Sequence, residues 1–232
     1  GHNSLRTPPL VMGHEFSGTV ESFGPRGGQK RDNIKVGQAI TVNPFVHCGM
    51  CKFCNDGLTQ LCVARKLIGA HRPGAFSEYV SVPEEQVLPL PDSMDMRVGA
   101  LTEPVAVGVR IGEQAGDLQG SSVFIAGAGP IGLLVLQALR LRGAGTIFIT
   151  ELDHARCAMA AKLGGEAIDP QSVDVVTHVL NETDGEGVSI AVDAVGTAGT
   201  MAHCVAVTAT MGKVILCGLH EESSIIPVGD IV

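Results

Sequence analysis

The sequence predicts a mainly-β region followed by an α/β region that is built on a doubly wound parallel sheet. Residues 10–100 contain short strand-like stretches that Gly, Pro, Asn and Asp separate, which is typical of β structure. From about Val105 onward, apolar strands alternate with helical stretches, which indicates βαβ units with right-handed crossovers. A glycine-rich turn between an apolar strand and an aliphatic helix lies in this second region, as expected of such a sheet.

The first region is expected to form a small barrel of short strands. We expect these strands at residues 17–22, 38–42, 76–82 and 86–88. Aromatic residues make up 3% of the chain and Trp is absent, so the core of both regions must be aliphatic.

The second region is expected to form a sheet with strand order 3-2-1-4-5. We expect its strands at residues 123–126, 146–150, 167–168, 188–193 and 213–217. We expect its helices at residues 104–116, 130–142, 155–163, 172–182 and 198–209. The helix over 130–142 is apolar on nearly every side, which predicts a buried helix rather than an amphipathic one.

The glycine-rich turn has the pattern G-x-G-x-x-G. Its first glycine makes the turn, its second lets a pyrophosphate approach, and its third lets helix pack on strand. The helix that follows offers free N–H donors and the positive end of its dipole to an anion. Proline fits the first helical turn, where its missing N–H has no cost. The pattern alone is weak, and its place after a strand strengthens it; the residues are Gly127, Gly129, Pro130, Ile131 and Gly132.

A nucleotide ribose needs an acidic residue at the end of the second strand, about 20 residues beyond the glycines. Glu151 directly follows that strand, and its carboxylate favours NAD because it would repel a 2′-phosphate. Asp153 is the competing acid, and we interpret it as the N-cap of the next helix. Arg156 lies one turn inside that helix, where a solvent-facing charge is nearly as good an interpretation as a cofactor contact.

Two further segments follow later strands of the sheet, where cofactors bind outside the carboxyl ends of parallel strands. Val195 and Gly196 come after the fourth strand, and Cys217, Gly218 and Leu219 come after the fifth. Simple turn residues are an equally good interpretation of each segment. We keep both segments as candidates for cofactor binding.

Four cysteines in the first region follow the pattern Cys-x2-Cys-x2-Cys-x7-Cys, at positions 48, 51, 54 and 62. Four thiolates complete a tetrahedral Zn²⁺ shell with no open position, so the pattern predicts a structural zinc site. An iron–sulfur cluster and free thiols are the rivals. Ferredoxin-type spacings differ from this one, and free thiols rarely fall into such order.

Composition excludes several classes of function. The formal net charge is -8, which argues against a nucleic-acid surface. No apolar run reaches transmembrane length, and no signal-peptide pattern opens the chain, so no membrane partner is expected. Seven cysteines, an odd number, indicate a reducing compartment, and cytoplasm is the default expectation. The chain lacks an initial Met and ends abruptly, so both ends resemble cuts through a larger protein.

Three motifs in order carry a resemblance that covers essentially the whole chain. Gly-His-Glu-Phe-Ser-Gly at 13–18 precedes the cysteine pattern, Gly-Ala-Phe-Ser-Glu-Tyr lies at 74–79, and Thr-Glu-Pro lies at 102–104. Together they resemble the zinc-dependent medium-chain dehydrogenases, which include alcohol, sorbitol, butanediol and threonine dehydrogenases. The resemblance implies an incomplete GroES-like catalytic domain over 1–103, with its cysteine lobe at 47–63. It also implies a Rossmann NAD-binding domain over 104–232, incomplete at its C-terminus.

The resemblance gives His14 and Glu15 a role that two adjacent surface residues would not otherwise have. In the polyol branch of the family, catalytic zinc is held by a Cys, this His and this Glu, and a Glu matching Glu103 lies beside the metal. Glu103 also suits the start of a helix, where the dipole favours an acid. No Cys precedes Gly13 in this chain, so the implied catalytic zinc site is short of a ligand. The cysteines outside the lobe fit better as small buried hydrophobes; they are Cys157, Cys204 and Cys217.

The implied activity is hydride transfer from a secondary alcohol or polyol to NAD, with zinc acting as a Lewis acid. The resemblance places Cys217–Leu219 on the nicotinamide side and Arg156 near the adenosine, and it implies a homodimer or homotetramer. One alternative is a non-catalytic nucleotide-binding remnant of the fold, and another is an NADP-linked reductase. The lobe cysteines and Gly-His-Glu argue against a zinc-free quinone or enoyl reductase. The sequence does not identify the alcohol.

Overall fold

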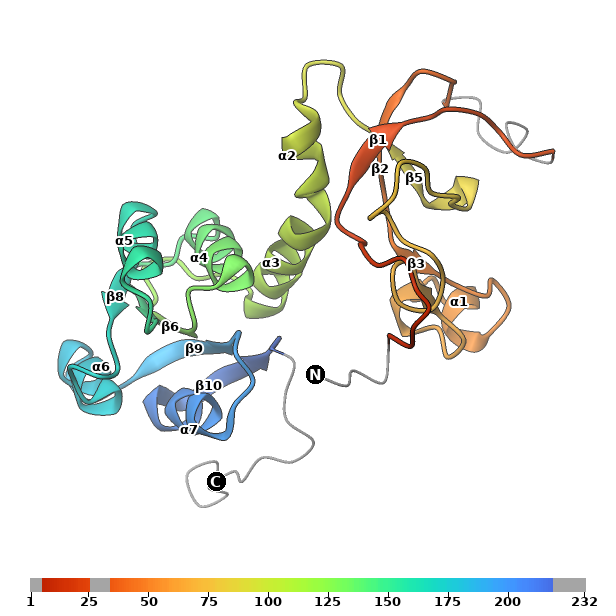
Figure 1. Ribbon diagram of the computed structural model, residues 1–232. Helices are drawn as coiled ribbons and strands as arrows, with labels where there is room; N and C mark the ends of the chain where they lie inside the picture. The colour runs from red at the N-terminus through yellow and green to blue at the C-terminus, as the bar shows by residue number, and fades with distance from the viewer. Residues whose placement is uncertain (1–5, 26–33, 219–232) are drawn as a thin grey trace. The chain divides into compact units, whose positions relative to one another are not determined.

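A computed structural model describes residues 6–25 and 34–218 of the chain (Figure 1). The chain divides into two compact units, Gly1–Glu103 and Pro104–Val232. Within the described residues, no helix is long and apolar enough to cross a membrane.

The first unit contains two small antiparallel sheets. In the larger sheet, β2 (Ala39–Val42) lies between β1 (Ser17–Thr19) and β5 (Val87–Pro89). In the smaller sheet, β3 (Phe45–Val46) pairs with β4 (Lys66–Leu67). The short helices of this unit are α1 (Lys52–Asn55), α2 (Met96–Ala100), η1 (Thr59–Leu61) and η2 (Glu84–Gln86). Its core is aliphatic, as expected; the buried members are Ile34, Ile40, Val42, Ile68 and Val87.

The prediction of a strand over 76–82 is wrong, because the described residues form no strand there. Only its first residue bonds to another segment in strand-like fashion, since the Phe76 N–H donates to the Met12 carbonyl at 2.9 Å. Phe76 and Tyr79 are 77% and 67% exposed. An alternating sequence forms a strand only where a neighbouring strand can pair with it, and no described strand lies along this segment.

The second unit contains one parallel sheet with the order β10-β9-β6-β7-β8, which is the 3-2-1-4-5 order that the sequence predicts (Figure 1). Its strands are β6 (Val123–Ala126), β7 (Ile147–Thr150), β8 (Glu166–Ile168), β9 (Val188–Asp193) and β10 (Thr208–Leu216). All residues of β6 and β7 are buried, as a sheet covered on both faces requires.

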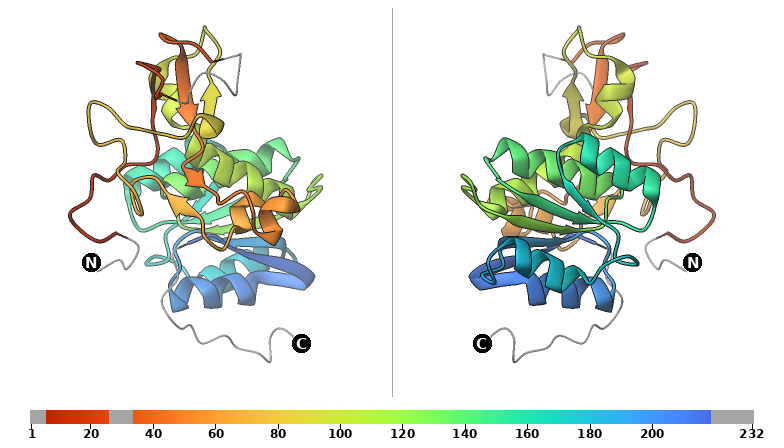
Figure 2. Two further views of the ribbon diagram at one scale, coloured as in Figure 1. Left: turned by 90° about the vertical axis from the view of Figure 1, so that its right-hand side faces the viewer. Right: turned by 90° about the vertical axis from the view of Figure 1, so that its left-hand side faces the viewer.

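Helices cover both faces of this sheet (Figure 2). Val123 and Ile125 pack toward a cluster that includes α3 (Thr102–Ala115), α4 (Pro130–Leu141) and α5 (His154–Lys162). Phe124 and Ala126 pack on the opposite face, toward α6 (Val175–Glu182) and α7 (Ala198–Val207). The alternation follows from the two-residue period of a strand.

Helix α4 differs from the expected fully buried helix. Its buried residues are Gly132, Val135, Leu136 and Leu139, which form one stripe at helical spacing. Leu141 on another side is 90% exposed. An aliphatic residue costs little at a helix surface, so apolar composition alone did not reveal which side faces the sheet.

Candidate functional site

The four lobe cysteines converge on one point of the first unit. Their Sγ atoms all lie within 4.8 Å of one another, with 3.5 Å between Cys51 and Cys54 and 3.9 Å between Cys48 and Cys54. Cys62 is buried, and none of the four forms a disulfide. Four sulfur ligands at this separation suit a closed tetrahedral zinc shell.

The backbone around the cysteine cluster stabilises thiolates. A backbone hydrogen bond from Cys54 lowers the pKa of Cys51 to about 6, and one from Met50 lowers the pKa of Cys48. Burial, with a hydrogen bond to Cys51, raises the pKa of Cys54 to about 11. Because zinc binds the deprotonated form, a cluster that already favours some thiolates fits the ion.

A second group of ligand atoms lies within the first unit, formed by the segment before β1 and by the last residue of the unit. One ligand atom from each of His14, Glu15 and Glu103 lies within 4.8 Å of the others. Helix α2 lies against β1, where Ser17 Oγ donates to the Met96 carbonyl at 2.5 Å. The Thr102 hydroxyl donates to the Gly99 carbonyl at 2.8 Å, which joins α2 to the start of α3. These contacts bring residues that are far apart in sequence to one point.

Tight backbone packing holds the segment before His14. A Cβ atom at Gly69 or Gly74 would collide with the carbonyl oxygen of Gly13, so the two loops approach as closely as glycine allows. The N–H of Ala75 donates to that carbonyl at 3.0 Å. The position of His14 is therefore set by a neighbouring loop as well as by β1.

The ligand atoms of this second group suit a metal cation. Burial is the main cause that raises the pKa of Glu103; the neighbouring His14 lowers this pKa, and the neighbouring Glu15 raises it. Two carboxylates and an imidazole form an oxygen- and nitrogen-rich set that Zn²⁺ accepts. Within the described residues the group has these three members and no cysteine. The described residues thus offer three ligand atoms here and four in the cysteine cluster.

The glycine turn lies at the carboxyl end of β6. Gly127 has a φ of 94°, which glycine adopts at no steric cost, and its N–H donates to the Thr150 carbonyl at 2.9 Å. A Cβ atom at Gly132 would collide with the Gly127 carbonyl oxygen, so the helix can pack here only with glycine. A Cβ atom at Gly129 would meet nothing within 4 Å. Gly129 is the N-cap of α4 and Pro130 begins the helix, so open space lies in front of its N-terminus.

Glu151 lies at the end of β7, beside this turn. Its carboxylate accepts hydrogen bonds from the N–H groups of Ala128 at 3.1 Å, Leu152 at 2.8 Å and Asp153 at 3.1 Å. Asp153 caps α5 as expected, because its side chain accepts from the Arg156 N–H at 2.9 Å. The Arg156 guanidinium lies 3.7 Å from the Glu151 carboxylate, a pairing that the sequence did not suggest.

The segments after β9 and β10 meet at the same edge of the sheet. Val195 and Gly196 donate to the buried carboxylate of Asp193, a residue that the sequence reasoning missed. Cys217 donates through Sγ to the Asp193 carbonyl at 3.3 Å, and burial raises its pKa to about 11. Cys204 is fully buried, while Cys157 and Cys217 are partly buried. Leu219 lies outside the described residues.

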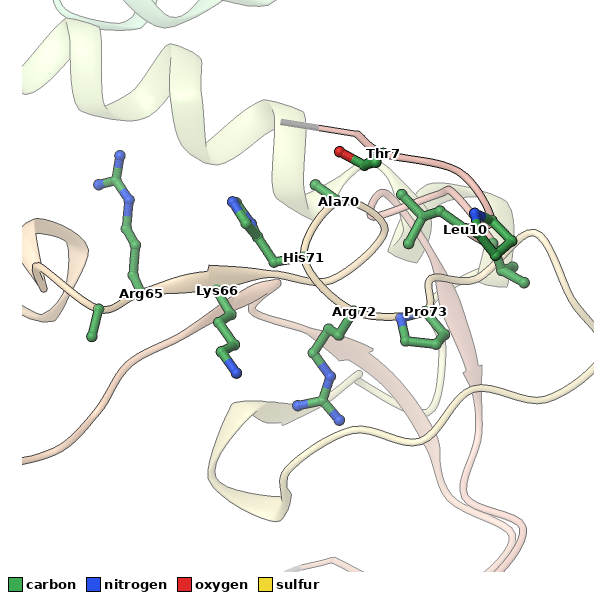
Figure 3. Close-up of a pocket in the computed structure, with 11 residues that line it drawn as sticks. Thr7, Leu10, Arg65, Lys66, Ala70, His71, Arg72 and Pro73 are labelled. Carbon is green, nitrogen blue, oxygen red and sulfur yellow. The ribbon is translucent and has the colours of Figure 1, made fainter. Parts of the chain in front are cut away.

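An open groove of about 1090 Å³ lies in the first unit, and the sequence did not predict it (Figure 3). It carries the basic side chains of Arg65, Lys66, His71 and Arg72 and no carboxylate or thiol, so it does not suit a metal ion. In Figure 3, Arg65 points away from Lys66 and Arg72, so these cations do not converge on one point.

Comparisons with known proteins identify the family that has this fold. The family described as Alcohol dehydrogenase GroES-like domain matches residues 1–92, and the family described as Zinc-binding dehydrogenase matches residues 130–232. The chain belongs to the zinc-dependent medium-chain dehydrogenase family.

Individual relatives are similar over nearly the whole chain. A sorbitol dehydrogenase of Bacillus subtilis is 31% identical over 96% of this chain and 63% of its own length. The structure of a 2R,3R-butanediol dehydrogenase from Bacillus subtilis has a TM-score of 0.85 and 33% identity, over 98% of this chain and 63% of that one. A structure from Sinorhizobium meliloti 1021, described as a zinc-binding dehydrogenase bound to NADP, has a TM-score of 0.89 and 34% identity. The match covers 97% of this chain and 66% of that one. This chain thus spans about 63% of the length of the sorbitol relative.

Proposed function

We propose that this chain carries the metal and nucleotide sites of a dehydrogenase that transfers a hydride from a secondary alcohol or polyol to NAD. The observation that carries the proposal is the convergence of His14, Glu15 and Glu103 within 4.8 Å, in a fold that also presents an open glycine turn. The names of the sorbitol and butanediol relatives support a polyol or secondary alcohol as substrate.

In this proposal, residues 1–103 form the catalytic domain and His14 and Glu15 hold the catalytic zinc, with Glu103 beside them. A zinc ion bound there would act as a Lewis acid on the alcohol oxygen. Glu103 contributes a carboxylate beside these ligands that can accept and release a proton. The cysteine cluster holds a second, structural zinc that fixes the lobe.

Residues 104–232 form the nucleotide domain of the proposal. The N–H groups at the start of α4 bind the pyrophosphate, and Gly129 leaves room for it to approach. Glu151 accepts from the ribose hydroxyls through Oε2, which also accepts from the Ala128 N–H. Val195, Cys217 and Gly218 line the nicotinamide side.

NADP is the second candidate cofactor, and a specific contact favours it. The Arg156 side chain is 56% exposed and lies 3.7 Å from the Glu151 carboxylate, where it could turn toward a 2′-phosphate. The NADP-bound relative is a further reason to test it. We favour NAD because the Glu151 carboxylate, which accepts three backbone hydrogen bonds, lies at the proposed ribose position and would repel a 2′-phosphate.

The test is turnover with a panel of diols and polyols, using NAD and NADP separately and following the reduced nicotinamide. We expect NAD reduction by the wild-type chain, and loss of it in His14→Ala. A chain that binds NADH and zinc without turnover would support the non-catalytic, nucleotide-binding alternative. A homodimer or homotetramer is also proposed, and light scattering on the same sample measures it.

A further inference from the structure

Asp193 is the last residue of β9, and its side chain is fully buried. It pairs with Ala126 of β6 on one side and with Leu216 of β10 on the other. Asp193 therefore lies between the strand that leads into the glycine turn and the strand that leads to Cys217. A buried carboxylate at the carboxyl end of an inner strand is unfavourable unless its oxygens accept several hydrogen bonds.

The carboxylate of Asp193 organises the turn that follows β9. Its Oδ1 atom accepts from the N–H groups of Val195 and Gly196, both at 3.0 Å. Its Oδ2 atom accepts from the Thr200 hydroxyl at 3.2 Å. Thr200 is part of the capping box of α7, so the same carboxylate fixes the turn and the start of the helix.

The main chain of Asp193 holds the next segment. Its carbonyl accepts from the N–H groups of Cys217 at 3.0 Å and Gly218 at 2.9 Å. A Cβ atom at Gly218 would lie 2.6 Å from the Val195 carbonyl carbon, so these two segments touch through their backbones. The segment after β10 is thus tied to the turn after β9.

The turn after β9 also touches the glycine turn. A Cβ atom at Gly127 would lie 2.5 Å from Val195 Cγ2, so Val195 closes directly over Gly127. The N–H of Ala194 donates to the Ala126 carbonyl at 3.0 Å. Three loops, after β6, β9 and β10, therefore meet at Val195 and Gly196, and Asp193 holds those two residues.

We propose that Asp193 is a positioning residue for the dinucleotide: its buried carboxylate fixes the Val195–Gly196 turn and thereby holds three loops in the arrangement that the cofactor requires. The inference rests on the proposed function, which places the cofactor at this edge. Loops that are already ordered lose less conformational entropy on binding, so the free chain binds more tightly. Asp193 itself does not touch the reacting atoms.

The test compares Asp193→Ala and Asp193→Asn with Val188→Ala, using NADH titration by fluorescence and thermal unfolding. Val188 is fully buried at the opposite end of the same strand, so its truncation destabilises the sheet without touching the loops. Asp193→Ala should weaken NADH binding about tenfold or more, since it leaves two backbone donors and one hydroxyl without their acceptor. Val188→Ala should leave NADH affinity within about twofold at a similar loss of melting temperature.

Asp193→Asn is the rescue variant. Its amide oxygen can still accept from Val195 and Gly196, and its NH2 group can donate to the Thr200 hydroxyl, so affinity should return to within about threefold of wild type. Hydrogen exchange without cofactor gives an independent readout. Amides 194–197 and 217–218 should lose protection in Asp193→Ala and keep it in Val188→Ala.

Each outcome decides the inference. Equal NADH affinity of Asp193→Ala and Val188→Ala overturns it, while the proposed function stands if wild type binds NADH. A wild type that does not bind NADH overturns the proposed function and the cofactor role together. If Asp193→Ala does not fold, Thr200→Val replaces it, because it removes the hydroxyl that Oδ2 accepts from. Unchanged affinity and unchanged exchange in Thr200→Val would then overturn the inference.

Discussion

Two glycines of the same turn should respond in opposite ways to the same substitution. Gly132→Ala places a methyl group against the Gly127 carbonyl oxygen, and backbone cannot give way as a flexible side chain can. Gly129→Ala places a methyl group in open space, with nothing within 4 Å. The first change should affect folding, and the second should affect only what approaches the turn from solvent.

The size of each effect follows from the local packing. Overpacking of a tight contact costs about 1–3 kcal/mol, so Gly132→Ala should lower the melting temperature by roughly 2–12 °C. Gly129→Ala should leave the melting temperature nearly unchanged, because no contact is strained and the residue has a φ of -65°. Its methyl group would nonetheless stand where a pyrophosphate must approach, so NADH affinity should fall about tenfold or more.

Thermal unfolding by circular dichroism and NADH titration by fluorescence measure both quantities on the same samples. The prediction fails if Gly132→Ala has the same melting temperature as wild type, or if Gly129→Ala binds NADH as tightly as wild type does. Gly116→Ala at the end of α3 is the wrong control because its φ of 89° would itself strain alanine. Gly199→Ala in α7 is suitable, since a Cβ there meets nothing within 4 Å, and it should change neither quantity.

Three further predictions concern charge and metal. Glu151→Gln should raise the ratio of NADPH to NADH affinity by about tenfold or more, because a unit charge about 4 Å from the phosphate contributes roughly 1–4 kcal/mol of repulsion; an unchanged ratio in paired titrations would contradict it. Cys54→Ser should remove the tightly held zinc of the cysteine cluster, which elemental analysis should find at about one per chain in wild type; iron in its place would reverse the assignment. In chelator-treated protein, burial keeps the folded pKa of Glu103 above its ordinary 4.5, so its protonated form favours folding. That contribution to stability is present below pH 4.5 and is lost as the pH rises through the raised pKa. Between these two pH values, the melting temperature of wild type should therefore fall relative to that of Glu103→Gln. Melting temperatures of the two proteins that change in parallel with pH would contradict this prediction.

The order of elements in the second unit could be predicted because it is local information. Val123–Ala126, the glycine turn and the aliphatic stretch behind it follow one another in the chain, and the strand order is the one expected of a doubly wound sheet. The spacing of the lobe cysteines is local in the same way, and their Sγ atoms do converge. The nearness of Glu103 to His14 came only from the family resemblance, because 88 intervening residues separate the two in sequence.

Long-range contacts account for what sequence reasoning missed. The sequence places Asp193 at the end of the expected strand over 188–193, but its role depends on the strands on both sides and on Gly127 and Gly218. A usable signal was present, since an acid that ends an apolar strand must find partners if it is buried. Arg156 lies in the first turn of α5, and its guanidinium lies 3.7 Å from the Glu151 carboxylate at the end of β7. The expected strand over 76–82 failed because pairing depends on a neighbour that the alternating pattern does not reveal.

Deuterium transfer tests the central claim most directly. The wild-type, zinc-loaded chain is incubated with NAD and a secondary alcohol deuterated at the carbinol carbon, and the nicotinamide product is analysed by mass spectrometry. The account predicts reduced nicotinamide that carries the deuterium, and no product from His14→Ala. Reduced nicotinamide without deuterium, or equal deuterium transfer by His14→Ala, would contradict the assignment of this chain as a zinc-dependent alcohol dehydrogenase.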